Sequence, residues 1–140
     1  LSIFSITLKE LTLSSTGKDS QLAFFAADAG TECALYWDLR HPGLTNTAFA
    51  TSSVYGGASS GVMCNRIDVR QNWTVPSADG NSATTVFTLS FQGNGTCAQV
   101  SVIKDANASA AFQTQIDSRG YNTCDLNNPR RMERGLRVRY

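Results

Sequence analysis

Four widely spaced cysteines constrain this 140-residue chain more than any other feature. They are Cys33, Cys64, Cys97 and Cys124. An even number of cysteines among short alternating segments is typical of a disulfide framework in an oxidising compartment. Three pairings are open. We favour Cys33–Cys64 with Cys97–Cys124, because the first bridge confines residues 38–62, a long Gly-, Ser- and Thr-rich stretch. Each bridge closes a loop of about 30 residues, worth about 3–4 kcal/mol in the chain-entropy model.

The same cysteines argue against a metal site. No C-x-x-C motif occurs, and His41 is the only histidine, so a Cys/His zinc cluster has too few ligands. We therefore predict no metal and no cofactor.

Length and charge indicate one secreted β-domain covering residues 1–140. The net charge of +1 gives no general attraction to nucleic acid. The longest purely apolar run, Leu22–Ala27, is far shorter than the ~20 residues of a membrane span. Leu1 is not Met, as expected for a mature extracellular chain after signal-peptide removal, although a trimmed chain looks the same. The oligomeric state stays open.

Alternation of apolar and polar residues predicts strands along most of the chain. In the N-terminal part, the apolar positions of residues 4–8, 22–26 and 33–37 alternate with polar ones, and a bulge near Lys9–Glu10 accounts for a change of phase. Further strands are predicted at 67–75, 86–91, 97–103 and 136–140, with a hairpin turn at Gly93–Gly95. Residues 105–116 are ambiguous, since Asp105 is also a candidate cap of a short helix. The predicted fold is all-β, an antiparallel β-barrel or β-sandwich stapled by two disulfides.

Catalytic constellations are sparse. His41 precedes a Pro-Gly turn and has no G-x-S-x-G elbow to serve, so a Ser–His–Asp triad is not indicated. Glu32 and Asp38 have matching parity near one predicted strand, and a small hydrolase needs only two suitably separated carboxylates. Isolated acidic residues are more often solvated surface, so we predict a protein that is not an enzyme.

The C-terminal stretch holds the one clear charge asymmetry, with five of the twelve basic residues. These are Arg130, Arg131, Arg134, Arg137 and Arg139. One interpretation is a binding patch for a phosphate, an acidic polysaccharide or an acidic partner protein. The other is a polar strand face whose arginines pair with carboxylates such as Glu133 and Asp125.

Two tryptophans and three sequons are further candidates. Trp37 and Trp73 can stack on a sugar ring, although a tryptophan in an alternating strand more often belongs to the core. N-glycosylation motifs begin at Asn72, Asn94 and Asn107, and Asn94 is favoured because a hairpin tip is exposed.

The N-terminal quarter carries a recognisable pattern, which runs Phe4-Ser5-Ile6-Thr7-Leu8, then Ser20–Phe25, then Thr31-Glu32-Cys33 with Trp37 after it. This pattern resembles small secreted fungal proteins related to the Alternaria major allergen, and the hypersensitive-response-inducing elicitors of plant pathogens. The resemblance implies a β-barrel or sandwich with two disulfides and no catalytic site.

The predicted function is that of a secreted fungal elicitor or effector that triggers plant defence or cell death. On this interpretation the chain binds a plant-surface or apoplastic protein or a wall glycan, through the loop 38–62 and the C-terminal arginines. A carbohydrate-binding β-module is the first alternative, and a small secreted hydrolase with a carboxylate pair is the second.

Overall fold

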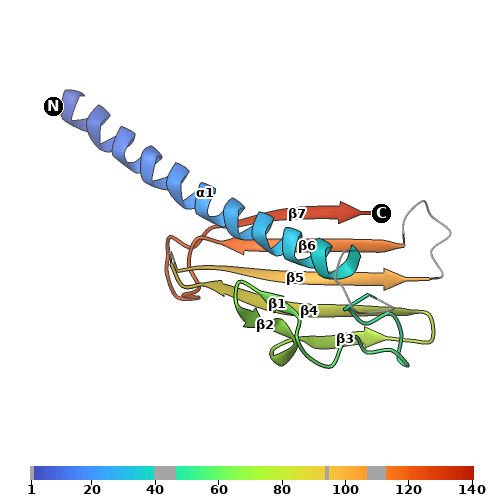
Figure 1. The fold of residues 1–140 in the computed structure, drawn as a ribbon. Helices are drawn as coiled ribbons and strands as arrows, with labels where there is room; N and C mark the ends of the chain where they lie inside the picture. Colours follow the sequence, from blue (N-terminus) through green and yellow to red (C-terminus); the bar gives the residue numbers. More distant parts are fainter. Residues whose placement is uncertain (1, 40–46, 94, 107–112) are drawn as a thin grey trace.

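The computed structural model describes residues 2–39, 47–93, 95–106 and 113–140, with side chains from residue 17 onward. One long helix, α1 (Ser2–Leu39), lies across one face of a five-stranded antiparallel sheet (Figure 1). The sheet order is β3-β4-β5-β6-β7, so each strand pairs with the next along the chain. A small two-stranded sheet, β1–β2, stands apart. The bounds are β1 (Met63–Cys64), β2 (Ile67–Asp68), the 3₁₀ helix η1 (Val69–Gln71), β3 (Thr74–Ala78), β4 (Ser82–Phe91), β5 (Thr96–Asp105), β6 (Thr114–Tyr121) and β7 (Glu133–Arg139).

The prediction of a mostly β, antiparallel and disulfide-linked chain is confirmed, but its N-terminal part is wrong. Residues 4–8, 22–26 and 33–37 do not form strands, because all of them belong to α1. Within the described residues the five-stranded sheet stays open, with β3 and β7 at its two edges. A closed barrel or a sandwich is therefore not confirmed.

Small residues explain why the segment is a helix. Ala23, Ala27, Gly30 and Ala34 recur every three or four residues, and all are buried against the sheet. Alanine is the best helix former, and between Lys18 and Leu39 Thr31 is the only β-branched residue. The period-2 interpretation followed the large side chains instead, of which Leu35 and Trp37 pack against the core whereas Phe24 is exposed.

The buried face of α1 approaches the sheet very closely. A Cβ atom at Gly120 of β6 would lie 1.9 Å from the backbone oxygen of Ala23, and one at Gly30 would lie 2.6 Å from Ser118 Oγ. Small residues of the helix therefore lie against small residues of the sheet, and this match fixes where α1 crosses β6.

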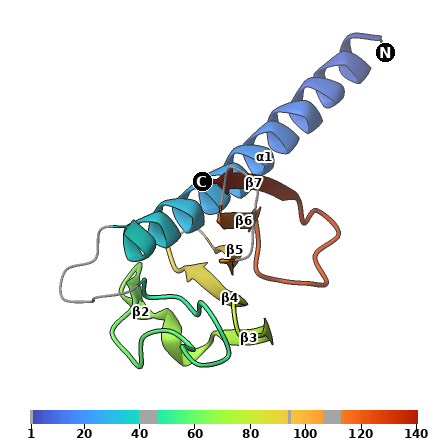
Figure 2. The same ribbon diagram turned by 90° about the vertical axis from the view of Figure 1, so that its right-hand side faces the viewer.

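The segment from residue 47 to β3 lies beside the half of the sheet that α1 does not cover (Figure 2), and its buried residues complete the core. Phe49 is fully buried, and its ring stacks on Phe87 of β4 at 5.8 Å between centroids. Ala58 and Val62 join the same apolar cluster. The described part of the stretch predicted as a recognition loop thus contributes Phe49, Ala58 and Val62 to the core, because β4 needs apolar cover that α1 does not supply, whereas residues 53–54 and 59–61 are exposed.

Several strand predictions are confirmed. The strands predicted at 86–91, 97–103 and 136–140 fall on β4, β5 and β7, and β4 and β5 are joined at the predicted hairpin, where Gly95 has φ +70°. The strand predicted at 67–75 is broken by η1, and β3 runs past Pro76 because it is an edge strand. The alternative of a helix over 105–116 fails at its ends: Asp105 closes β5 and Ile116 lies in β6.

Both favoured disulfides are present. Cys33–Cys64 joins α1 to β1 with Cα atoms 5.9 Å apart, and Cys97–Cys124 joins β5 to the segment before β7 with Cα atoms 5.2 Å apart. The first therefore anchors the helix to the chain that covers β4, and the second holds the segment 122–132.

Candidate functional site

The N-terminal part of α1 continues beyond the end of the sheet (Figure 1). A helix of 38 residues measures about 57 Å at 1.5 Å per residue. Contacts described between α1 and the rest of the chain begin at Asp19 and Ser20, which meet Arg130 and Arg134. Just before them, a Cβ atom at Gly17 would meet nothing within 4 Å. We call residues 2–18 the projecting segment.

Large apolar side chains are exposed on the part of α1 that is docked on the sheet. Phe24 and Phe25 are 52% and 51% exposed, and Tyr36 is 46% exposed. Asp28 and Glu32 lie between them at helical spacing, so these side chains line one side of the helix. Among the described residues, no ion pair involves either carboxylate. We call these five residues the helix stripe.

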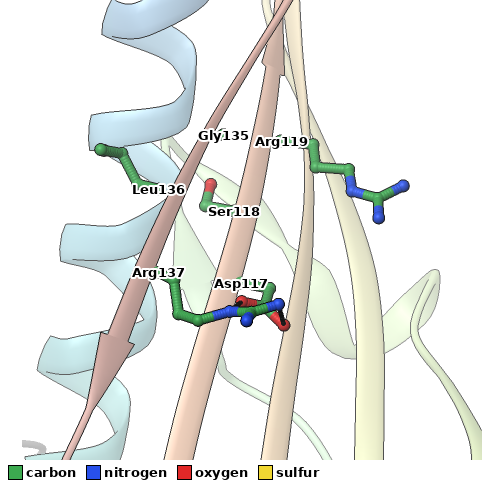
Figure 3. A pocket seen from close by; sticks show the side chains of 6 residues that line it. All are labelled: Asp117, Ser118, Arg119, Gly135, Leu136 and Arg137. Carbon is green, nitrogen blue, oxygen red and sulfur yellow. Dashed lines mark hydrogen bonds and ion pairs between the residues drawn. The ribbon is translucent and has the colours of Figure 1, made fainter.

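The face of the sheet opposite α1 is polar and carries arginines. On β6 and β7, Arg119 lies opposite Gly135, Asp117 opposite Arg137, and Gln115 opposite Arg139. Figure 3 shows Leu136 pointing toward α1, whereas Arg119 points away from it, and Asp117 and Arg137 lie side by side. A hollow of about 320 Å³ lies among these residues. We call Arg119, Arg137 and Arg139, with Asp117 and Gln115, the arginine face.

Hydrogen bonds order most of the arginine face. Arg137 Nε donates to Asp117 at 2.6 Å, Gln115 donates to the same carboxylate at 2.8 Å, and Arg139 Nε donates to Gln115 at 2.9 Å. Partial burial opposes ionisation of Asp117, but the bonds from Arg137 and Gln115 outweigh it and hold its pKa below the ordinary value. Arg119 is 65% exposed, and within the part of the chain that the structure describes its ion pair is a long 3.8 Å contact with Glu133, which exposure makes weak.

A second hollow, of about 350 Å³, adjoins the arginine face at the Tyr121 end of β6. The Arg131 guanidinium lies 3.7 Å from the centroid of the Tyr121 ring. Leu126, from the disulfide-held segment, is 77% exposed at the rim. Burial and the hydrogen bond to Glu133 raise the pKa of Tyr121, so its hydroxyl stays protonated and donates. We call this hollow the tyrosine notch.

The five C-terminal arginines do not form one patch. Arg137 and Arg139 belong to the arginine face, and Arg131 covers Tyr121. Arg130 lies 3.7 Å from a carboxylate of α1, and Arg134 Nε donates to a serine of α1 at 3.0 Å. The strand alternation separates them, because successive side chains of β7 point to opposite faces of the sheet. Arg130 and Arg137 thus pair with carboxylates, although with Asp19 and Asp117 rather than Glu133 or Asp125, and the binding-patch interpretation stays a prediction.

Arg119 was missed by the sequence analysis. It stands alone in the sequence, and only the pairing of β6 with β7 places it beside Arg137. The detectable signal is that Arg119, Arg137 and Arg139 all occupy positions that alternate with apolar residues, such as Ile116 and Val138, which face α1.

Neither predicted sugar-stacking tryptophan presents an open ring. Trp73 is only 7% exposed, with Phe49 on one side and the Arg70 guanidinium 4.8 Å from its centroid. Trp37, near the end of α1, packs on the core and donates its indole N–H to the Met63 carbonyl at 2.9 Å. The structure uses both for packing.

One buried titratable cluster ties the end of α1 to the sheet. The Asp38 carboxylate is 1% exposed and lies 2.5 Å from Lys104 Nζ of β5. Thr47 and Tyr140 also donate hydrogen bonds to it. Burial opposes its charge, but these three donors outweigh that cost and lower its pKa. The same contact and the loss of solvent raise the pKa of Tyr140. Every partner is already engaged, so the cluster is structural.

The remaining candidates do not assemble into a site. Glu32 is exposed on α1 whereas Asp38 is buried in its ion pair, so the proposed carboxylate pair does not converge. Asn72 is exposed and its amide donates to the Thr88 carbonyl at 3.3 Å. His41, Asn94 and Asn107 lie outside the described residues. In the part of the chain that the structure describes, no three His, Cys, Asp or Glu residues form a metal-binding group.

Comparisons with family models, curated proteins and solved structures returned no match for this chain. Among the described helices, none combines the length and the apolar character that crossing a membrane requires. The elicitor function and its plant partners stay predictions, and so does secretion, with which the two disulfides are compatible.

Proposed function

We propose that the protein is a building block of a multi-subunit assembly. In this assembly, copies of the chain pack through their projecting segments, and each sheet is displayed at the end of its own helix. The protein acts by association and display rather than by catalysis.

The single observation that carries this proposal is that α1 extends beyond the end of the sheet. The projecting segment has about 17 residues, and an isolated helix of that length is marginal in water because most helical stability comes from packing. Gly17 stands in open space, and the docked contacts start two residues later. A helix that continues beyond its own support therefore needs a partner.

The composition of the projecting segment favours other helices as that partner. Six of its residues are large and apolar, and they are Ile3, Phe4, Ile6, Leu8, Leu11 and Leu13. The rest are mainly Ser and Thr, and the only charged residues are Lys9, Glu10 and Lys18. Segments of this kind bury apolar surface when they pack side by side, and every copy of the chain supplies an identical segment.

The docked half of α1 holds the sheet in a fixed position relative to the projecting segment, so such an assembly has a defined geometry. The Cys33–Cys64 bridge, the Asp38–Lys104 ion pair and the close crossing at Gly120 all lie on the docked half. Because α1 is one continuous helix, the position of the projecting segment sets the position of the sheet. The disulfides favour assembly outside the reducing cytosol.

Sedimentation velocity of the full chain over a wide concentration range tests the proposal. We expect reversible self-association, which Ile6→Lys with Leu13→Lys weakens at least tenfold, because a charge in a packed helix contact loses its hydration. Gln21→Lys is the matched control, since it adds the same charge at an exposed position of the docked half. A wild-type chain that stays monomeric, or association that the double variant leaves unchanged, contradicts the proposal.

The plant-recognition function remains open to a separate test. The pattern that suggested it lies in α1 and is not a strand pattern in the structure. Infiltration of the purified protein into leaves is the direct assay, and the absence of necrosis or of a defence response would count against it.

A further inference from the structure

The molecule carries an acidic and aromatic surface on one side and a basic surface on the other. The helix stripe lies on α1, which covers one side of the sheet (Figure 2), and the side-chain alternation of β6 and β7 places the arginine face on the opposite side. From Gln21 to Leu39, α1 contains no basic residue. The arginine face carries three guanidinium groups, beside the carboxylates of Asp117 and of Glu133, which lies 3.8 Å from Arg119.

We propose that the helix stripe of one copy docks on the arginine face of the next copy. This inference rests on the proposed function, since it names a second contact within the same assembly. The occupant of each surface is thus a second copy of this chain, and the charges of the two surfaces are complementary.

The spacing of the charges agrees on the two surfaces. Asp28 and Glu32 are one helical turn apart, or about 6 Å along the axis. Arg137 and Arg139 are two residues apart on β7, or about 6.8 Å along the strand. Arg119, on β6, adds a further exposed donor beside Arg137. A guanidinium can therefore lie near each carboxylate while Arg137 keeps its hydrogen bond to Asp117.

Apolar groups adjoin the charges on both surfaces. The helix stripe has Phe24 and Phe25 one turn before Asp28. The arginine face is followed by the tyrosine notch, where Leu126 is exposed and Tyr121 lies two residues from Arg119 along β6. An aromatic ring that enters this notch removes apolar surface from water, which supplies affinity, whereas the charge pairs orient the two copies.

The arrangement also determines the symmetry. Two helix stripes placed together oppose carboxylate to carboxylate, and two arginine faces oppose arginine to arginine. The contact is therefore heterologous, and because the two surfaces lie on opposite sides of the molecule, it repeats from copy to copy instead of closing a two-fold dimer.

Charge-reversal complementation of the full chain tests the contact. One variant carries Asp28→Arg with Glu32→Arg, and the other carries Arg119→Glu with Arg139→Glu, which leaves the Arg137–Asp117 pair intact. Each variant alone opposes like charges, so we expect at least tenfold weaker self-association at low salt by sedimentation velocity. An equal mixture restores association to within about threefold of wild type, because alternating copies then join the two reversed surfaces at one contact and the two original surfaces at the next.

The controls separate this contact from the projecting segment and from misfolding. Arg66→Glu reverses one exposed charge away from both surfaces and is expected to change nothing. Circular dichroism confirms folding, and if the double helix variant is unfolded, Glu32→Arg alone gives the same readout at an exposed position. A wild-type monomer overturns both proposals. Association that both variants retain, or that their mixture fails to restore, overturns only the docking of helix stripe on arginine face.

Discussion

Replacing Gly120 by alanine is the sharpest test of how α1 is held. Gly120 lies in β6 directly beneath the helix, where an added Cβ would stand 1.9 Å from the Ala23 carbonyl oxygen and 2.3 Å from the Ala27 backbone nitrogen. Both atoms belong to the helix backbone, so no side-chain rotation relieves the clash. The helix has to move away from the sheet by about 1.5 Å to restore ordinary contact distances.

The cost follows from what that displacement opens. Ala23, Ala26 and Ala27 are fully buried against the sheet, and their methyl groups are too short to fill the gap that this displacement opens. Overpacking typically costs about 1–3 kcal/mol, and a clash with rigid backbone belongs at the upper end. We therefore expect Gly120→Ala to lower the free energy of unfolding by about 3 kcal/mol. At this chain length that corresponds to about 10 °C in melting temperature.

Gly135→Ala is the matched control, because Gly135 lies on the neighbouring strand and its added Cβ would meet only the Ser118 carbonyl oxygen at 4.0 Å. We expect a change within about 0.5 kcal/mol. Thermal melts and urea titrations followed by circular dichroism measure both variants. Equal stability of the two variants would refute the close crossing of α1 on β6, and with it the fixed direction of the projecting segment.

The remaining predictions concern the core and its titratable cluster. The folded-state pKa of Asp38 is lowered, so its contribution to stability is complete well above its ordinary value of 3.8 and is lost as the pH falls through the folded pKa. In urea titrations, the free energy of unfolding of Asp38→Asn should therefore depend less on pH in the acid range than that of the wild type. The pKa of Tyr140 is raised, so its contribution is complete below 10.0 and is lost as the pH rises further, and Tyr140→Phe should flatten that alkaline decline. Removing the Cys33–Cys64 bridge by double alanine substitution should lower the free energy of unfolding by about 3.5 kcal/mol in denaturant titrations. An unchanged free energy of unfolding would show that the bridge does not stabilise the fold. Phe49→Ala should cost about 3–5 kcal/mol, whereas a free recognition loop would tolerate it.

The second half of the fold was predictable because its signals are local. In β4 and β5 the alternation of Phe87 and Leu89 with polar residues marks one buried face, and Gly93–Gly95 marks the hairpin. The two disulfides followed from the need to confine long stretches between cysteines. The strand and hairpin signals depend on residues close in sequence, so a single sequence is enough to find them.

The helix was missed because its decisive residues are small. Scanning for large apolar side chains between residues 22 and 37 finds Leu22, Phe24, Leu35 and Trp37, which imitate strand spacing. The residues of α1 that are buried most completely against the sheet are mainly alanines and Gly30, which contribute little to any hydrophobic pattern. Their role becomes visible only when they are set against the equally small Ser118 and Gly120 of β6.

The arginines show the same dependence on register. A run of C-terminal arginines suggested one patch, yet strand alternation sends Arg134 toward α1 and Arg137 to the opposite face. Arg119 joins the latter only through the pairing of β6 with β7.

The small residues that hid the helix from the sequence pattern also bear on the proposed assembly. A helix docked by large interlocking side chains uses them on the face that meets the sheet, whereas α1 docks through alanine and glycine and through a disulfide and an ion pair at its end. Phe24 and Tyr36 are therefore left on the solvent side, and Phe25 is half exposed while its ring packs edge-on against Phe91. Exposed aromatic groups beside carboxylates that form no ion pair within the described residues are costly for a solitary molecule and useful for one that meets its neighbours. The close docking of α1 and the exposure of the helix stripe are thus two consequences of one distribution of residue sizes around the helix, and both favour a protein that works in contact with copies of itself.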